Sequence, residues 1–383
     1  MSFRHFKSFI LVSLIIFLAQ FNSNACTGIR LIAKDGGVVY GRTMEWGAFD
    51  LNSRILIIPR NYHFKGTTPD GFNGKSYYTK YGVVGLDALH TNLISDGMNE
   101  KGLAAGLFYH SGYEQYNEYV KQDSSNTISS LDVVNYILSQ FASVEEVKDG
   151  MKKVAVVLHP DIPGITGVCY EVHWMVTDTT GASIVIEYRD HKMVVYNSIP
   201  GVITNNPYYD WHLINLSNYL NLSQKPFATK TIVNSALQDT FYIKPVGAGS
   251  GMLGLPGDNT PPSRFVRAVA WTQTARPLCC AEEAVYETFR ILDNFQLPLG
   301  PGAAEGGGGN IDKTKGMRSS TEWTTAWNLT DRTLNYHTQH NRRVRFLDLK
   351  KLSFTSPEKE PKITYIPLDV VKEQDKDDIT PQL

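Results

Sequence analysis

The first 25 residues fix where the folded part of this chain can begin. They run from a basic start, through an almost wholly apolar stretch at residues 9–19, to a short polar segment that ends in small residues. Segments of this kind in this order are typical of a secretory signal peptide. Ser23 and Ala25 occupy the −3 and −1 positions of a cleavage site after which the chain begins at Cys26. We therefore expect residues 1–25 to be removed and the mature protein to be periplasmic or secreted.

Cleavage at this point would place a thiol and a free α-amine on the same residue, Cys26. The thiolate is the nucleophilic form of cysteine, and a free thiol has a pKa of about 8.5. An α-amine, with a pKa of about 7.7–8.0, is partly neutral near pH 7 and can accept the thiol proton. The sequence therefore predicts Cys26 as a catalytic nucleophile. Two alternatives stay open, namely lipid attachment to Cys26 and a disulfide bond.

Composition excludes several function classes. The chain has 383 residues, of which 42% are hydrophobic and 20% charged, as is ordinary for a folded globular protein. A net charge of −1 gives no reason to expect a nucleic acid or an anionic membrane surface as partner. No apolar run after residue 25 approaches the roughly 20 residues of a membrane-spanning helix. We expect neither nucleic acid as a partner nor a membrane span in the mature chain.

The cysteines and histidines do not form a recognisable metal-binding pattern. The four cysteines lack the dense spacing of a disulfide scaffold; they are Cys26, Cys169, Cys279 and Cys280. Cys279 and Cys280 precede a helical pattern, and we interpret them as small packed apolar residues. CxxC and HExxH motifs are absent, so no structural or catalytic metal is expected. We interpret His173, in a strand-like run, as a hydrogen-bonded sheet residue rather than a ligand.

Strand-like runs dominate the mature chain and do not alternate regularly with helices. Strand patterns occupy residues 26–33, 38–46, 54–59, 81–88, 101–110, 171–178, 182–190, 192–198, 201–206, 323–330, 333–338, 344–349 and 363–368. Helical spacing of apolar residues, or a helix-capping pattern, is found at residues 130–142, 143–153, 210–220, 263–273 and 281–295. This arrangement predicts an α+β fold with antiparallel sheets and helices packed outside them.

The remaining segments complete the expected organisation. We expect loops at residues 60–80 and 244–262, and a turn at Asp96–Glu100 between two strands. No change of composition marks a linker. The sequence therefore predicts one domain over residues 26–383, with a charged tail from about residue 355.

Five short motifs follow one another in a distinctive order. They are Cys26-Thr27-Gly28, the Gly41–Trp46 segment, the Asp96–Leu103 segment, Thr204-Asn205-Asn206-Pro207, and Leu255-Pro256-Gly257-Asp258 ahead of Ser263-Arg264-Phe265. This series resembles the choloylglycine hydrolase family, which holds conjugated bile salt hydrolases and penicillin V acylases. The resemblance extends from Cys26 to about Leu349, nearly the whole mature chain.

The resemblance implies a fold and a reaction. Members belong to the N-terminal nucleophile hydrolases, which fold as a four-layer αββα sandwich. They cleave linear amides of small N-acyl compounds through an acyl-cysteine intermediate and require no cofactor. Relatives are often tetramers, so a homotetramer is one expectation.

The resemblance also implies roles for individual residues. Cys26 matches the nucleophile, Arg42 an arginine that stabilises its thiolate, and Arg264 a second arginine near the site. Glu45 stands where the family usually has an aspartate that holds the α-amine, and Asn205 matches an oxyanion-binding asparagine. Without the family, the two arginines and Glu45 are also consistent with surface or structural residues, and Asn205 with a turn residue.

The acyl pocket is the least determined part of the site. Tyr109 matches a position whose backbone N–H serves the oxyanion, although a shifted register would place Phe108 there. A bulky aromatic residue at this position favours a smaller or aromatic acyl group, and apolar residues within 51–66 are candidates to line the pocket. Three functions stay open: a penicillin V acylase-like or bile salt hydrolase-like amidase, an N-acyl homoserine lactone acylase, and a catalytically inert secreted binding protein.

Overall fold

The computed structural model describes residues 26–162, 170–300, 312–356 and 360–369. The predicted signal peptide, Cys169 and most of the predicted tail lie outside these ranges. Among the described residues, none of the helices has the length and apolar character needed to cross a membrane.

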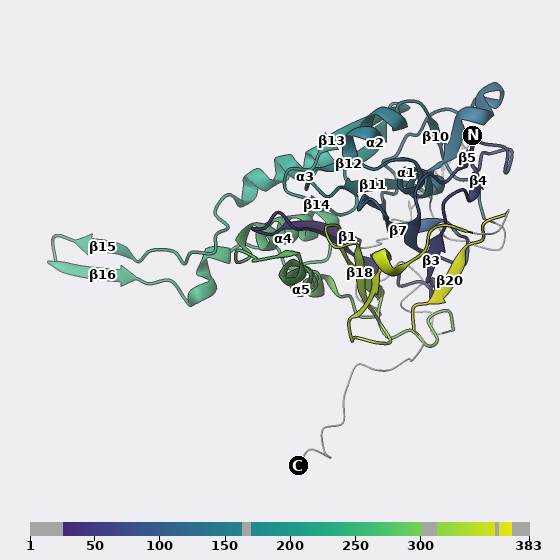
Figure 1. The fold of residues 1–383 in the computed structure, drawn as a ribbon. Helices are drawn as coiled ribbons and strands as arrows, with labels where there is room; N and C mark the ends of the chain where they lie inside the picture. The colour runs from purple at the N-terminus through teal and green to yellow at the C-terminus, as the bar shows by residue number, and fades with distance from the viewer. Residues whose placement is uncertain (1–25, 163–169, 301–311, 357–359, 370–383) are drawn as a thin grey trace, which may run out of the picture.

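Two large antiparallel sheets form the centre of the molecule (Figure 1). The first has six strands in the order β14 (Val202–Ile203), β1 (Thr27–Ile32), β2 (Val38–Glu45), β17 (Thr321–Asn328), β18 (Thr333–Thr338) and β19 (Arg345–Asp348). The second has eight strands in the order β13 (Lys192–Asn197), β12 (Ser183–Arg189), β11 (Val172–Thr177), β8 (Ala104–Tyr109), β7 (Ile94–Asn99), β6 (Val83–Asp87), β3 (Arg54–Ile58) and β20 (Thr364–Pro367).

Smaller elements complete the described chain. Three two-stranded sheets pair β4 (His63–Lys65) with β5 (Ser76–Tyr78), β9 (Thr127–Ser129) with β10 (Ala155–Val157), and β15 (Lys230–Asn234) with β16 (Asp239–Ile243). The α-helices are α1 (Val133–Gln140), α2 (Val144–Met151), α3 (Tyr209–Asn215), α4 (Pro261–Thr274) and α5 (Ala281–Leu292). Short 3-10 turns cover residues 121–126, 130–132, 216–219, 248–252, 293–295 and 349–351.

Apolar side chains divide the molecule into four layers. One buried cluster joins the two sheets to each other and to α4 and α5, and includes Ile29, Phe108 and Trp327. A second cluster joins the outer face of the eight-stranded sheet to α1 and α2, and includes Leu138 and Trp174. Helices therefore cover both outer faces of the stacked sheets, which confirms the predicted αββα sandwich.

Local sequence explains several of these elements. Ser143 caps α2, because its side chain accepts a hydrogen bond from the Glu146 backbone N–H at 3.2 Å. Proline at the first two positions starts α4, where a missing N–H costs nothing. Gly41 allows α5 to pack closely on β2, since a Cβ at this position would lie 2.4 Å from Thr288 and 2.6 Å from the Thr325 carbonyl oxygen.

Three expectations about local structure are wrong. Asp96 and Asn99 belong to the buried strand β7 rather than to a turn, because neighbouring groups satisfy their side chains. The Thr325 hydroxyl donates to Asp96 at 2.7 Å, and Asn99 donates to the Leu138 carbonyl at 2.8 Å. The predicted loop at residues 60–80 contains the β4–β5 hairpin, and Cys279 is exposed rather than packed.

One element stands apart from the sandwich. The β15–β16 hairpin projects away from the body of the molecule, and every residue of both strands is exposed (Figure 1). It carries large apolar side chains, among them Ile232, Val233, Phe241 and Tyr242. Sequence analysis assigned no structure to these residues.

Candidate active site

The predicted site residues come together at one end of the six-stranded sheet. Cys26 directly precedes β1, which lies between β14 and β2. Arg42 lies opposite Gly28 across the β1–β2 pair, and Glu45 ends β2. Asn205 follows β14 by two residues. Two elements outside this sheet complete the group, since α4 supplies Arg264 and the end of β8 supplies Tyr109.

Asn205 connects the other groups through hydrogen bonds. Its Oδ1 accepts from the Cys26 nitrogen at 3.0 Å and from Arg264 Nη2 at 2.6 Å. Its Nδ2 donates to the Tyr109 carbonyl oxygen at 2.7 Å. Arg264 also donates to the Cys26 carbonyl oxygen and, at 3.0 Å, to Thr27 Oγ1. The Asn205 carboxamide is therefore held on both of its ends, directly beside Cys26.

Arg42 is fully buried beneath the site, so it is not a surface residue. Its guanidinium donates to the carbonyl oxygens of Ser95 and Leu107 and lies 4.4 Å from the centre of the Phe108 ring. Burial alone would lower the pKa of Arg42, but nearby ionisable groups, Cys26 first among them, outweigh burial and raise that pKa. Arg42 therefore supplies a fixed positive charge near the thiol.

Arg264 is also fully buried. Burial lowers the pKa of Arg264 to about 10, so the side chain stays charged at neutral pH. With Arg42 it places two cationic groups around Cys26.

Glu45 is buried and lines the same cavity as Cys26. Its Oε1 accepts from the Thr321 hydroxyl at 3.3 Å, whereas its Oε2 has no hydrogen-bond partner within the described ranges. Burial raises the pKa of Glu45 to about 8. A buried carboxyl oxygen without a partner, in the cavity wall beside Cys26, is suited to receive a cationic group.

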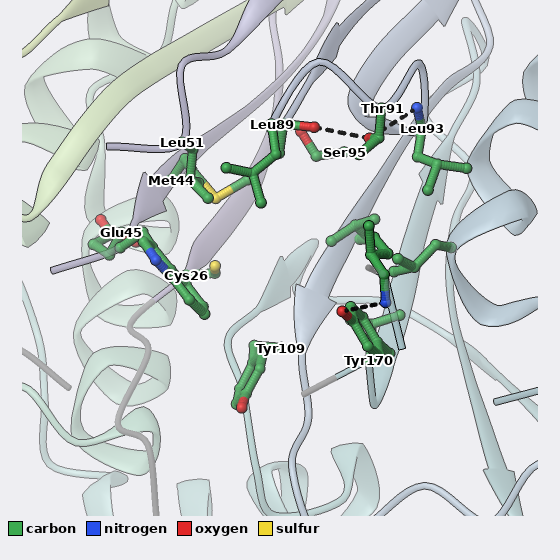
Figure 2. Close-up of a pocket in the computed structure, with 16 residues that line it drawn as sticks. Cys26, Met44, Glu45, Leu51, Leu89, Thr91, Leu93, Ser95, Tyr109 and Tyr170 are labelled. Atoms are coloured by element: carbon green, nitrogen blue, oxygen red, sulfur yellow. Dashed lines mark hydrogen bonds between the residues drawn. The ribbon is translucent and has the colours of Figure 1, made fainter. Parts of the chain in front are cut away.

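A largely apolar cavity of about 110 Å³ opens beside Cys26. Figure 2 shows Cys26 and Glu45 at one side of this cavity and Tyr170 at the other, with Tyr109 between them. Its wall is formed by Cys26, Met44, Glu45, Trp46, Leu51, Ala88, Leu89, Thr91, Leu93, Ser95, Leu107, Tyr109, Leu131, Ile162, Tyr170 and Val172.

The two residues considered for the oxyanion position have side chains in different surroundings, and the expected pocket segment contributes little to the cavity wall. Tyr109 lines the cavity. The Phe108 side chain instead packs against Gly28, so closely that a Cβ on Gly28 would lie 2.6 Å from the Phe108 ring. Of residues 51–66, only Leu51 lines this cavity. Much of the remaining wall comes from the β6–β7 connection (Ala88, Leu89, Thr91 and Leu93) and from Tyr170 and Val172 at the start of β11. These segments carry no motif or periodic pattern that could have predicted their role.

Comparison with known proteins identifies the chain. Residues 26–364 match the family model described as linear amide C–N hydrolases, choloylglycine hydrolase family. The chain belongs to the choloylglycine hydrolase family. It is therefore a hydrolase of linear amide C–N bonds.

Relatives of this hydrolase cover most of its length. It is 32% identical to a bile salt hydrolase/transferase of Clostridium perfringens over 85% of this chain and 93% of that protein. It is 26% identical to a penicillin V acylase of Pectobacterium atrosepticum over 82% of this chain and 78% of that protein. A crystal structure of a variant of the Clostridium perfringens conjugated bile acid hydrolase matches with a TM-score of 0.72 and 29% identity, covering 89% of this chain and 96% of that one.

Proposed function

We propose that Cys26 is the nucleophile of this amide hydrolase and that it acts as the amino-terminal residue of a processed chain. The observation that carries this proposal is the position of Cys26, which lies in the wall of the apolar cavity with its nitrogen bound to Asn205. The family match also begins at residue 26.

The first chemical step moves one proton and forms one bond. The α-amine created by processing accepts the thiol proton, and the thiolate attacks the carbonyl carbon of the substrate amide. Asn205 Oδ1 already binds the Cys26 nitrogen, and the buried Oε2 of Glu45 offers an acceptor to the ammonium that forms. Arg42 and Arg264 stabilise the thiolate.

The tetrahedral intermediate then collapses to an acyl-enzyme. Its oxyanion accepts hydrogen bonds from the second N–H of the Asn205 amide and from the Tyr109 backbone N–H, since the Tyr109 carbonyl occupies only one Asn205 N–H. The C–N bond breaks as the ammonium returns its proton to the leaving nitrogen. Water, losing a proton to the amine, attacks the thioester and releases the carboxylic acid and the thiol.

We propose N-acyl compounds with an apolar acyl group as substrates. The cavity wall is mostly aliphatic and aromatic, and Trp46 packs edge-on against Tyr109 at 6.3 Å between ring centres. Penicillin V and conjugated bile salts both fit this class, and relatives carry both names. The aromatic residue at Tyr109 favours the aromatic phenoxyacetyl group of penicillin V.

We also propose that the precursor is exported, so that the mature enzyme is periplasmic or secreted. The leader pattern at residues 1–25 supports export. A homotetramer is the proposed assembly, and the exposed apolar surface of the β15–β16 hairpin supports contact with further copies of the chain.

A cysteine substitution tests the proposed nucleophile. Cys26→Ala should fold normally but hydrolyse neither penicillin V nor a conjugated bile salt, because no other group replaces the thiol. Cys279→Ala, which changes an exposed cysteine, is the matched control and should retain full activity. Product release at the wild-type rate by Cys26→Ala would contradict the assignment, and failure of the wild type to hydrolyse either compound would contradict the substrate class.

A further inference from the structure

Three buried histidines lie behind Asn205, and the reaction described above does not use them. His110 follows β8, His173 lies on β11 and His212 lies on α3. All three side chains are almost completely inaccessible to solvent. The interpretation of His173 as a hydrogen-bonded sheet residue is confirmed. The sequence did not predict that His110, His173 and His212 all contact the same segment of the chain.

Each imidazole contacts a different carbonyl oxygen of the Thr204–Pro207 segment. His173 Nε2 lies 3.0 Å from the Thr204 oxygen, His212 Nε2 lies 2.9 Å from the Asn205 oxygen, and His110 Nε2 lies 3.2 Å from the Pro207 oxygen. A carbonyl oxygen can only accept a hydrogen bond, so Nε2 must carry the proton in all three rings. Three N–H groups therefore converge on the four-residue segment that contains Asn205.

We propose that His110, His173 and His212 are positioning residues that fix the Asn205 carboxamide against Cys26 by holding this segment. The inference rests on the proposed role of Asn205 in catalysis. Because the Asn205 side chain bonds at once to the Cys26 nitrogen, Arg264 and the Tyr109 carbonyl, a small shift of its backbone changes all three contacts.

Buried carboxyl groups orient two of the rings. Glu114 Oε1 lies 2.6 Å from His110 Nδ1, while its Oε2 accepts from the Tyr188 backbone N–H at 2.7 Å. Burial raises the pKa of Glu114 to about 9, so the protonated carboxyl donates to His110 Nδ1. Glu187 Oε1 lies 3.1 Å from His173 Nδ1 and accepts from the Tyr209 N–H at 2.9 Å.

The ring of His212 is held differently. It stacks on Phe265 of α4 with 4.7 Å between ring centres, and its Nδ1 has no hydrogen-bond partner among the described residues. Burial lowers the pKa of His212 to about 4. A neutral ring with its single proton on Nε2 agrees with both observations, because a proton on Nδ1 would have no acceptor.

A bound metal ion is a poorer explanation of the same cluster. One ligand atom from each of His110, Glu114 and His173 lies within 4.8 Å of the others. The rings of His110 and His173, however, stack in parallel, 4.0 Å apart with 5° between their planes. Parallel rings direct their in-plane lone pairs side by side rather than to one point, and the ring nitrogens already face carbonyl or carboxyl oxygens.

Paired substitutions at His212 test the inference with whichever of penicillin V or a conjugated bile salt the wild type hydrolyses. His212→Gln keeps an N–H near the Nε2 position and should keep kcat within about threefold of the wild-type value. His212→Leu removes the donor at similar size and should lower kcat by about tenfold to a hundredfold, as expected for a displaced catalytic group. KM should change little, because His212 does not line the cavity.

His337→Leu provides the matched control, since His337 is a buried imidazole on β18 that packs against Phe289 and faces Asp293. It should leave kcat unchanged. Equal losses in His212→Gln and His212→Leu, or a wild-type kcat in folded His212→Leu, would overturn the inference while leaving the role of Cys26 intact.

Nitrogen NMR of the histidine rings tests the same inference without substrate and without relying on a variant that folds. The wild-type protein at pH 7 should show protonated Nε2 and unprotonated Nδ1 for His212 and His110. A protonated Nδ1 on a neutral His212, or a stoichiometric metal ion by elemental analysis, would contradict it. If both rings carry the proton on Nε2 but the protein hydrolyses neither test compound, the proposed function is contradicted and the positions of the histidine protons are not.

Discussion

At the scale of single residues, the site consists of charged and polar groups that have been removed from water. Arg42, Glu45, Asn205 and Arg264 are all buried, and an unpaired charge in such a place is strongly unfavourable. The network compensates by directing each group to a partner or to the cavity. The same burial raises the pKa of Glu45 to about 8 and lowers the pKa of Arg264 to about 10, and pKa values perturbed in this way cluster at active sites.

The raised pKa of Glu114 makes stability depend on pH. Glu114 titrates at about 9 in the folded protein and near its ordinary value of about 4.3 in the unfolded chain. Between these values the folded state binds one more proton. The free energy of unfolding should therefore fall, from this group alone, by about 1.4 kcal/mol per pH unit near pH 7 and by about half that slope at pH 9.

Glu114→Gln isolates this contribution, because an amide can donate to His110 and accept from Tyr188 as the protonated carboxyl does. Urea unfolding of both proteins at pH 7, 8 and 9 should show a shallower decline in the variant. Glu45 titrates in the same range in both proteins and cancels in the comparison. Parallel declines would show that Glu114 is already ionised in the folded protein.

Motif order predicted the polar centre of the site but not its surroundings. Cys26, Arg42, Asn205 and Arg264 could be located because each stands in a short motif. The sequence pattern places Asp96 in a turn, because residues 96–100 lie between two strand-like runs. Its partners Thr325 and Trp327 are more than 200 residues away, and a sequence pattern does not show which distant groups satisfy a buried acid.

At the scale of elements, most strands follow the alternation and apolar content of the sequence, and the β4–β5 and β15–β16 hairpins are exceptions. Both strands of β15–β16 are exposed on both faces. A two-stranded hairpin is only marginally stable alone in water. Contact with another surface would bury its apolar side chains and so stabilise the hairpin. Local periodicity could not identify this hairpin, because no core lies against it to impose an inward and an outward face.

The hairpin should control assembly. Ile232 and Phe241 lie opposite each other across the two strands. The double substitution Ile232→Ser with Phe241→Ser should convert the proposed oligomer to a monomer, because it removes a facing apolar pair. Light scattering after size-exclusion chromatography measures the mass.

The control pair for this experiment is Thr231→Ser with Thr240→Ser, which changes only polar side chains of the same strands and should preserve the wild-type mass. A wild-type chain that is monomeric at all concentrations would contradict the proposed assembly. An oligomer that survives removal of both apolar side chains would show that another surface holds the copies together.

At the scale of the whole molecule, the sandwich explains why residues distant in sequence meet at one point. Cys26, Arg42 and Asn205 come from three neighbouring strands or their ends, and Tyr109 comes from the facing sheet. The thiol therefore lies between a rigid polar network and an apolar cavity. The α-amine of Cys26 can act as the base only if all residues N-terminal to Cys26 have been removed.

Mass mapping of the acid-quenched enzyme tests this central claim most directly. Enzyme mixed briefly with penicillin V, or with a conjugated bile salt if that is the compound hydrolysed, should yield a terminal peptide that begins at Cys26 and carries the acyl group on its sulfur. A terminal peptide that begins elsewhere, or an acyl group on any other residue during turnover, would contradict the account.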